Sequence, residues 1–129
     1  MYRWIDHTAE VELEIAADSE REVLADALAA LADLLDARGE GDELRSVELH
    51  AADRPALLAA WLEELVFLAE TEGFEPLGLE SLELGDDRLR ATVRGRLGAP
   101  PHLVKAVTYH RLAFAPADSG YSASVVLDV

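Results

Sequence analysis

The sequence predicts a two-layer α+β domain in which two helices pack on one face of a mostly antiparallel or mixed sheet. Residues 10–15 alternate between acidic and apolar, two leucine-rich segments repeat with helical spacing, and four strand-like segments follow the second of them. The expected order of elements is therefore β-α-β-α-β-β-β-β. Because the chain has 129 residues and no evident linker or internal repeat, we expect residues 1–129 to form one domain.

The first strand is expected at residues 10–15, where three glutamates alternate with three apolar residues. A capping box at Ser19 and Glu22 then begins a helix, because the serine oxygen can accept from the backbone N–H of Glu22 while the carboxylate reaches back. Apolar residues at helical spacing predict that this helix continues until Gly39. They include Leu24, Leu28, Leu31 and Leu35.

A second strand is expected near residues 47–51, followed by a helix with Asp53 as its N-cap and Pro55 in its first turn. Gly73 is the natural end of that helix. Its apolar residues include Leu57, Trp61, Leu65 and Leu68, joined by Leu58, Leu62 and Val66.

Four further strands are expected at residues 77–84, 88–97, 104–114 and 121–129. The tight turn from Gly85 to Arg88 would place Glu83 opposite Arg90. Four basic residues fall on one face of the strand at residues 88–97, and we expect them to pair with glutamates across the sheet or to contact phosphates. They are Arg88, Arg90, Arg94 and Arg96.

The net charge of −15 is the strongest compositional feature. A surface this acidic repels an RNA backbone on average, so any role in RNA chemistry is expected to act through a basic protein partner or a bridging metal. The alternative interpretation is that the negative charge serves only to keep the protein soluble. The chain has no cysteine, which excludes disulfides and thiolate sites. No secretory signal or membrane-spanning segment is evident, and we expect a cytoplasmic location.

Glu10 stands at the entrance of the first strand, after Asp6-His7-Thr8, where backbone carbonyls and hydroxyls near a carboxylate would make an oxygen-rich corner suited to a hard divalent cation. Asp128 and the terminal carboxylate of Val129 would be two nearby negative charges at the end of the last strand, which repel each other unless a cation or a basic residue neutralises them. The alternative interpretations are a solvated acidic face for Glu10 and an exposed tail for Asp128. Lys105 either faces these carboxylates or a phosphate, or reaches the solvent from a strand edge.

The four histidines lack the i, i+4 helical spacing of a zinc metalloprotease. His7 and His110 are the better candidates for a shared site because each adjoins a motif, although hydrogen-bonded structural roles fit them equally well. The chain contains no nucleophile elbow, P-loop or dinucleotide fingerprint.

Several short motifs follow one another along the chain. The opening motif is His7-Thr-Ala-Glu10-Val11, and the lysine motif is Lys105-Ala-Val-Thr-Tyr-His110. The others are Trp61-Leu-Glu-Glu-Leu-Val-Phe, residues 95–102 and the terminal Val126-Leu-Asp128. Taken together and in this order, these motifs resemble the archease family over essentially the whole chain.

The resemblance implies an accessory protein, not itself an enzyme, for an RtcB-type RNA ligase that joins RNA ends in tRNA splicing or RNA repair. It implies that the protein promotes guanylylation and multiple turnover of that ligase, with GTP bound only by the ligase and RNA contacted through it. It further implies a divalent metal (Mg²⁺, Mn²⁺ or Ca²⁺) at Glu10 and Asp128, and a functional Lys105. Glu10 replaces the aspartate usual in the family, and Arg96 stands where an acidic residue is expected.

Two other functions remain open at the level of sequence. One is a stand-alone metal-dependent phosphatase or nuclease, for which only carboxylates can be named as catalytic groups. The other is a chaperone-like acidic interaction module, in which the motif residues would have no effect on the activity of a partner.

Overall fold

The structure is a computed structural model that describes residues 1–7, 9–102 and 104–129, apart from the side chain of His7. The described residues form seven strands and two helices. The strands are β1 (Tyr2–His7), β2 (Glu10–Ala17), β3 (Glu43–His50), β4 (Phe74–Leu84), β5 (Arg88–Leu97), β6 (Ala106–Ala117) and β7 (Gly120–Asp128). The helices are α1 (Glu20–Leu34) and α2 (Arg54–Glu72).

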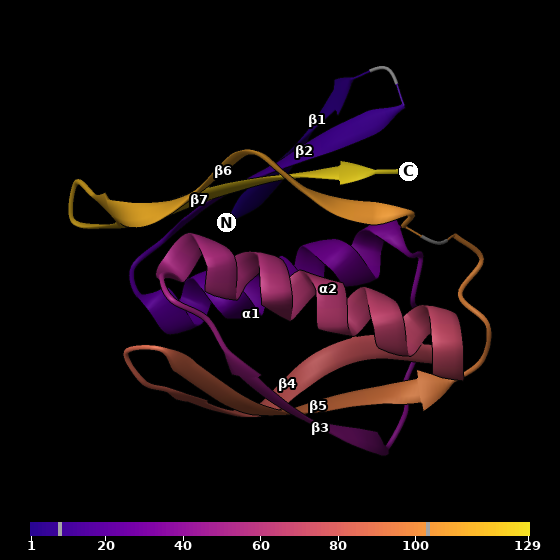
Figure 1. Ribbon diagram of the computed structural model, residues 1–129. Helices are drawn as coiled ribbons and strands as arrows, with labels where there is room; N and C mark the ends of the chain where they lie inside the picture. The colour runs from indigo at the N-terminus through magenta and orange to yellow at the C-terminus, as the bar shows by residue number, and fades with distance from the viewer. Residues whose placement is uncertain (8, 103) are drawn as a thin grey trace.

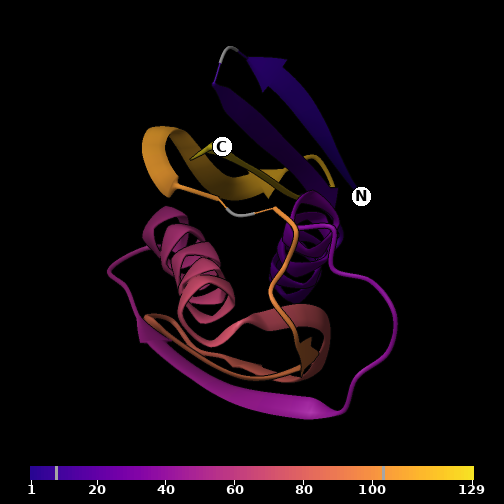
Figure 2. The same ribbon diagram turned by 90° about the vertical axis from the view of Figure 1, so that its right-hand side faces the viewer.

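The strands form two separate antiparallel sheets, and the helices lie side by side between them (Figures 1 and 2). The four-stranded sheet has the order β1-β2-β7-β6, and the three-stranded sheet has the order β3-β5-β4. Strand β7 is thus an interior strand, paired with β2 on one side and β6 on the other. This arrangement holds Asp128 on a strand that is hydrogen-bonded on both sides.

Both helices begin at the residues that the sequence indicated. The Ser19 oxygen accepts from the backbone N–H of Glu22 at 3.1 Å, and the Asp53 carboxylate accepts from that of Ala56 at 2.9 Å. Helix α2 ends at Gly73, whose φ of 63° is the left-handed conformation that glycine adopts without a steric penalty. Helix α1 ends at Leu34 instead of continuing towards Gly39, because the chain turns at Asp36, where φ is 58°.

The core lies between the two sheets and is built around the helices. Trp61 is fully buried, and its indole N–H donates to the carbonyl oxygen of Leu24 at 3.0 Å, which ties α2 to α1. Helix α2 buries residues on most of its circumference, since it packs against a sheet on each side. These buried residues are Leu57, Leu58, Ala59, Trp61, Leu62, Leu65, Val66, Leu68 and Ala69.

The α+β class and the order of elements from Glu10 onward are confirmed. The structure differs in adding β1 and in dividing the strands between two sheets, so that the layers number three. The physical reason lies in the helices, which are apolar on two sides and cannot be covered by one sheet. Strand β4 also begins earlier than expected, at Phe74, and β6 runs on to Ala117.

Candidate functional site

Glu10 and Asp128 lie directly opposite each other on neighbouring strands. They are register partners at the ends of β2 and β7. The next pair outward is hydrogen-bonded, because the Val129 N–H donates to the Ala9 carbonyl oxygen at 3.4 Å. In an antiparallel ladder the adjacent pair is then non-hydrogen-bonded, which is the closer kind, with Cβ atoms about 4.5–5.5 Å apart. The two side chains therefore leave the same face of the sheet at neighbouring positions, which we call the Glu10/Asp128 corner.

Lys105 meets this corner through its backbone. Its N–H donates to the carbonyl oxygen of Asp128 at 2.9 Å, just before β6 begins. Its exposed side chain lines a hollow against α2, together with Glu63 and Phe67. The sheet thus brings the backbones of Glu10, Lys105 and Asp128 close together in space. The Lys105 side chain lies on the side towards α2.

The acidic row on β2 is not uniformly solvated. Glu14 pairs with Arg3 at 2.7 Å, and Glu12, whose side chain is only 12% exposed, pairs with Arg111 at 3.3 Å. Within the part of the chain that the structure describes, neither Glu10 nor Asp128 has a basic partner at ion-pair distance. Two carboxylates held on facing strands repel each other, so the corner favours a cation.

Strand β6 is distorted beside the corner. Its register with β7 is interrupted between Thr108 and Ala113, and Arg111 adopts a φ of 57° within this bulge. From β6, Arg111 forms an ion pair with Glu12 on β2. The residue of β7 that lies opposite Glu12 is Val126, and it is fully buried. Sequence alternation gave no sign of this, because a bulge depends on the partner strand. Arg111 was consequently missed as a residue of this face.

Thr108 is a further residue that the sequence did not single out. Its hydroxyl oxygen is buried without a hydrogen-bond partner among the described residues. Thr108 faces Val126, two residues before Asp128, so it lies on the same face of the sheet about 7 Å from the corner. A buried hydroxyl without a partner is costly unless water or a ligand satisfies it.

The corner offers oxygen atoms only, which is the donor set of hard divalent cations. The described residues contain no cluster of three His, Asp or Glu side chains placed to hold a metal. A metal at this position would therefore take Glu10 and Asp128 and complete its coordination with other oxygens, such as backbone carbonyls, water or the terminal carboxylate of Val129. The residues fit such an ion through the chemistry of their donors.

The two histidines are placed differently. His110 lies in the β6 bulge with its side chain exposed, and no described contact ties it to the corner. The backbone of His7 ends β1 and pairs with Glu10, but its side chain lies outside the described residues, so its expected role stays a prediction.

The arginine face of β5 is paired with glutamates, as one of the two interpretations expected. Glu83 does lie opposite Arg90 in the register, although the carboxylate nearest to Arg90 is that of Glu48, at 3.8 Å. The Arg94 pair with Glu80 measures 3.1 Å, and the Arg96 pair with the buried Glu75 measures 2.5 Å. This face is therefore a ladder of cross-strand ion pairs.

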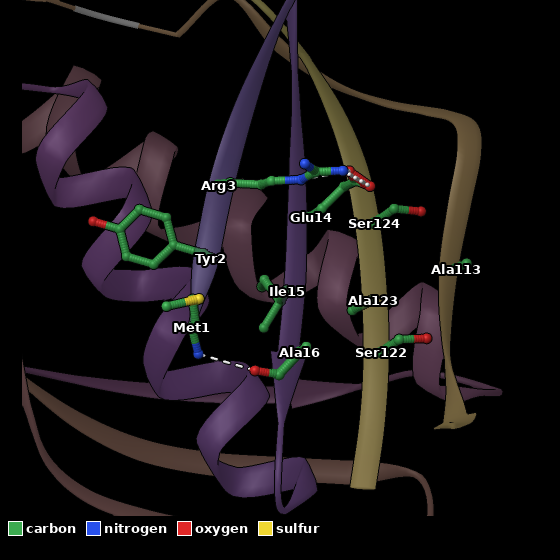
Figure 3. A pocket seen from close by; sticks show the side chains of 10 residues that line it. All are labelled: Met1, Tyr2, Arg3, Glu14, Ile15, Ala16, Ala113, Ser122, Ala123 and Ser124. Carbon is green, nitrogen blue, oxygen red and sulfur yellow. Dashed lines mark hydrogen bonds and ion pairs between the residues drawn. The ribbon is translucent and has the colours of Figure 1, made fainter. Parts of the chain in front are cut away.

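A separate hollow of about 500 Å³ lies on the outer face of the four-stranded sheet (Figure 3). Its lining includes small side chains such as Ala16, Ala113 and Ser122, together with the ion pair between Arg3 and Glu14. Its lining residues on β2 lie four to six residues beyond Glu10, about 13–20 Å away along the strand. It is thus distinct from the Glu10/Asp128 corner.

This α+β fold of two antiparallel sheets enclosing two helices is shared by solved structures. The solution structure of protein 1598 from Methanobacterium thermoautotrophicum superimposes with a TM-score of 0.79 at 29% identity, covering 99% of this chain and 98% of that one. The crystal structure of an archease, described as a possible chaperone, from Thermotoga maritima gives a TM-score of 0.73 at 22% identity, covering 100% and 98%.

Sequence comparison agrees with the structural one. Residues 2–129 match the model of the Archease protein family. The chain is 35% identical to protein archease of Archaeoglobus fulgidus, over 99% of this chain and 98% of the relative, and 34% identical to that of Methanopyrus kandleri, over 97% and 96%. The chain belongs to the archease family. None of the helices in its described part is long and apolar enough to cross a bilayer.

Proposed function

We propose that this protein is an activator of an RtcB-type RNA ligase, which promotes guanylylation and repeated turnover of the ligase in tRNA splicing or RNA repair. The observation that carries the proposal is the pairing of Glu10 with Asp128 across β2 and β7, beside the backbone of Lys105. Glu10 lies on the second strand, Lys105 directly precedes the sixth, and Asp128 ends the seventh. Family membership supports the same role.

The corner would hold one divalent cation through Glu10 and Asp128, with Val129 as the third expected ligand. Such an ion supplies positive charge that can neutralise phosphate oxygens. Glu10 has one methylene more than the aspartate expected there, so its carboxylate reaches further from β2. Lys105 contributes a compact positive charge on the neighbouring side of β6, suited to a phosphate or to an acidic group of the partner.

The protein acts on the ligase and is not a catalyst itself. With a net charge of −15, it is suited to a basic protein surface that otherwise holds RNA phosphates. GTP and RNA are then bound by the ligase, and the activator meets them only through it. We place this activity in the cytoplasm.

A single-turnover guanylylation assay tests this function. Purified ligase is mixed with GTP and a divalent metal, with and without the activator, and the rate of ligase guanylylation is measured. We expect Asp128→Ala and Lys105→Ala to lose most of the stimulation, whereas Glu83→Gln, an exposed change on β4, retains it. Circular dichroism confirms that each variant folds. Full stimulation by folded Asp128→Ala and Lys105→Ala would refute the assigned roles.

A further inference from the structure

A groove of about 340 Å³ separates α2 from the start of β6. One wall is a stripe along α2 formed by Glu63, Phe67 and Glu70, which share a helix face because they are spaced i, i+4 and i+7. The other wall comes from Lys105 and Tyr109. These five residues define what we call the α2/β6 groove. It opens next to the segment that is hydrogen-bonded to Asp128.

The groove exposes two aromatic side chains that a core would normally cover. Phe67 is 53% exposed and Tyr109 is 64% exposed. Both belong to the short set of large apolar side chains that are exposed in the described part of the chain. Neighbouring exposed aromatic residues with a charged rim are typical of protein interaction sites.

The walls of the groove are joined by a hydrogen bond. The Tyr109 hydroxyl donates to the Glu63 carboxylate at 2.8 Å, across the gap between β6 and α2. This bond raises the pKa of the Tyr109 hydroxyl, so the residue stays a neutral donor. The aromatic ring is therefore held at the rim instead of moving freely in solvent.

The charges of the groove select its occupant. Glu63 and Glu70 lie seven residues apart on α2, which places them about 10 Å apart along the helix axis. Neither has a basic partner at ion-pair distance in the described ranges. Phe67 lies between them. A matching segment would carry two basic side chains about 10 Å apart with an apolar side chain between them. The phosphates of an RNA backbone would be repelled by these two carboxylates.

We propose that the α2/β6 groove docks a basic segment of a protein partner, with an apolar side chain seated against Phe67 and Tyr109. The two basic side chains of that segment pair with Glu63 and Glu70, and the Lys105 ammonium donates to a carbonyl or carboxylate oxygen of the segment. For the identity of the partner this inference rests on the proposed function. The groove would then hold the ligase while the adjacent corner meets its active site.

The first test uses a model peptide and does not depend on the ligase. The probe is an alanine-based helical peptide with arginine at positions i and i+7 and leucine at position i+4, titrated into isotopically labelled protein and followed by NMR. We expect chemical shift changes centred on the α2/β6 groove. The double variant Glu63→Gln/Glu70→Gln should weaken binding roughly five- to tenfold, from two exposed ion pairs. Phe67→Ala should weaken it about tenfold or more.

The matched control removes two charges elsewhere. Glu40→Gln/Glu83→Gln alters the net charge equally on exposed residues outside the groove, and should leave the affinity for the peptide within about twofold. Equal weakening by both double variants, or shift changes spread over all acidic surfaces, would overturn the proposal. Preferential binding of a short RNA over the peptide at the groove would also overturn it.

The second test separates the groove from the proposed function. Affinity for the ligase is measured for the wild-type protein, Glu63→Gln/Glu70→Gln and Phe67→Ala, alongside the stimulation of guanylylation. Weaker binding by the groove variants, with full stimulation recovered at saturating concentration, supports the groove. Unchanged binding by these variants refutes it. If the wild-type protein neither binds nor stimulates the ligase, the proposed function fails, and the peptide titration still decides whether the groove docks a basic segment.

Discussion

The buried carboxylate of Glu75 offers the sharpest test of how the chain is held near Lys105. Glu75 is 3% exposed, and its Oε2 accepts from the Nε of Arg96 at 2.5 Å. The carboxylate lies close to Gly98, whose N–H donates to the Gly73 carbonyl oxygen at 2.8 Å where the chain leaves β5 towards Lys105. The ion pair between Glu75 and Arg96 thus stabilises the start of the segment that connects β5 to Lys105.

Replacing Arg96 with alanine would leave the Glu75 charge buried without its partner. Breaking a fully buried ion pair costs about 3–5 kcal/mol. The Arg96 side chain is 46% exposed, so water can partly replace it, and we expect the free energy of unfolding to fall by about 2–3 kcal/mol. In a domain of this size, that loss corresponds to a melting temperature lower by roughly 6–12 °C.

Urea unfolding followed by circular dichroism measures this loss, with the free energy obtained by linear extrapolation. Arg90→Ala is the matched control: its nearest carboxylate is 3.8 Å away and both side chains are about half exposed, so its cost should stay below about 1 kcal/mol. Adding Glu75→Met to Arg96→Ala should recover most of the stability, because the charge is then gone. Equal costs for Arg96→Ala and Arg90→Ala would show that the reasoning is wrong.

Three further predictions concern a tyrosine, a helix cap and the metal. The raised pKa of Tyr109, due to its bond with Glu63, stabilises the fold below about pH 10, and this contribution is lost as the pH rises through the raised pKa. Ultraviolet titration should show one late-titrating phenol fewer in Tyr109→Phe than in the wild-type protein. Asp53→Ala removes the cap that accepts from the Ala56 N–H and should cost about 0.5–2 kcal/mol in urea unfolding, and no cost would contradict the cap. Saturating Ca²⁺ or Mn²⁺ at about 100 times its dissociation constant should stabilise the wild-type protein by about 2.7 kcal/mol in a thermal shift assay, and an equal gain in Asp128→Asn would exclude the corner.

Local features of the sequence predicted the elements well because their causes are local. A serine or aspartate oxygen next to free backbone N–H groups begins a helix whatever surrounds it, and both Ser19 and Asp53 do so here. The turn from Gly85 to Arg88 likewise fixes the register that sets Glu83 opposite Arg90. Such features act within a few residues, so they can be read without the fold.

The second sheet and the first strand could not be read in this way. Helix α2 is apolar on most of its surface, which is consistent with a sheet packed on each side of it. The periodicity of the sequence, however, does not tell how many sheets pack against a helix. The alternation in β1 is short and mixes Tyr2 and Trp4 with charged residues. Strand β1 pairs with the edge of β2 that is not occupied by β7, and this edge exists only once the sheet has formed.

The amino-acid sequence by itself determined the α+β class, the order of elements from Glu10 onward, the N-caps of both helices, the family resemblance and the presence of acidic and basic residues at strand ends. Only the tertiary structure decided that β7 is inserted between β2 and β6, which places Glu10 opposite Asp128 and the Lys105 side chain towards α2. Strand pairing joins residues more than a hundred positions apart, and its register is set by packing on both faces of the sheet. No local pattern contains that information.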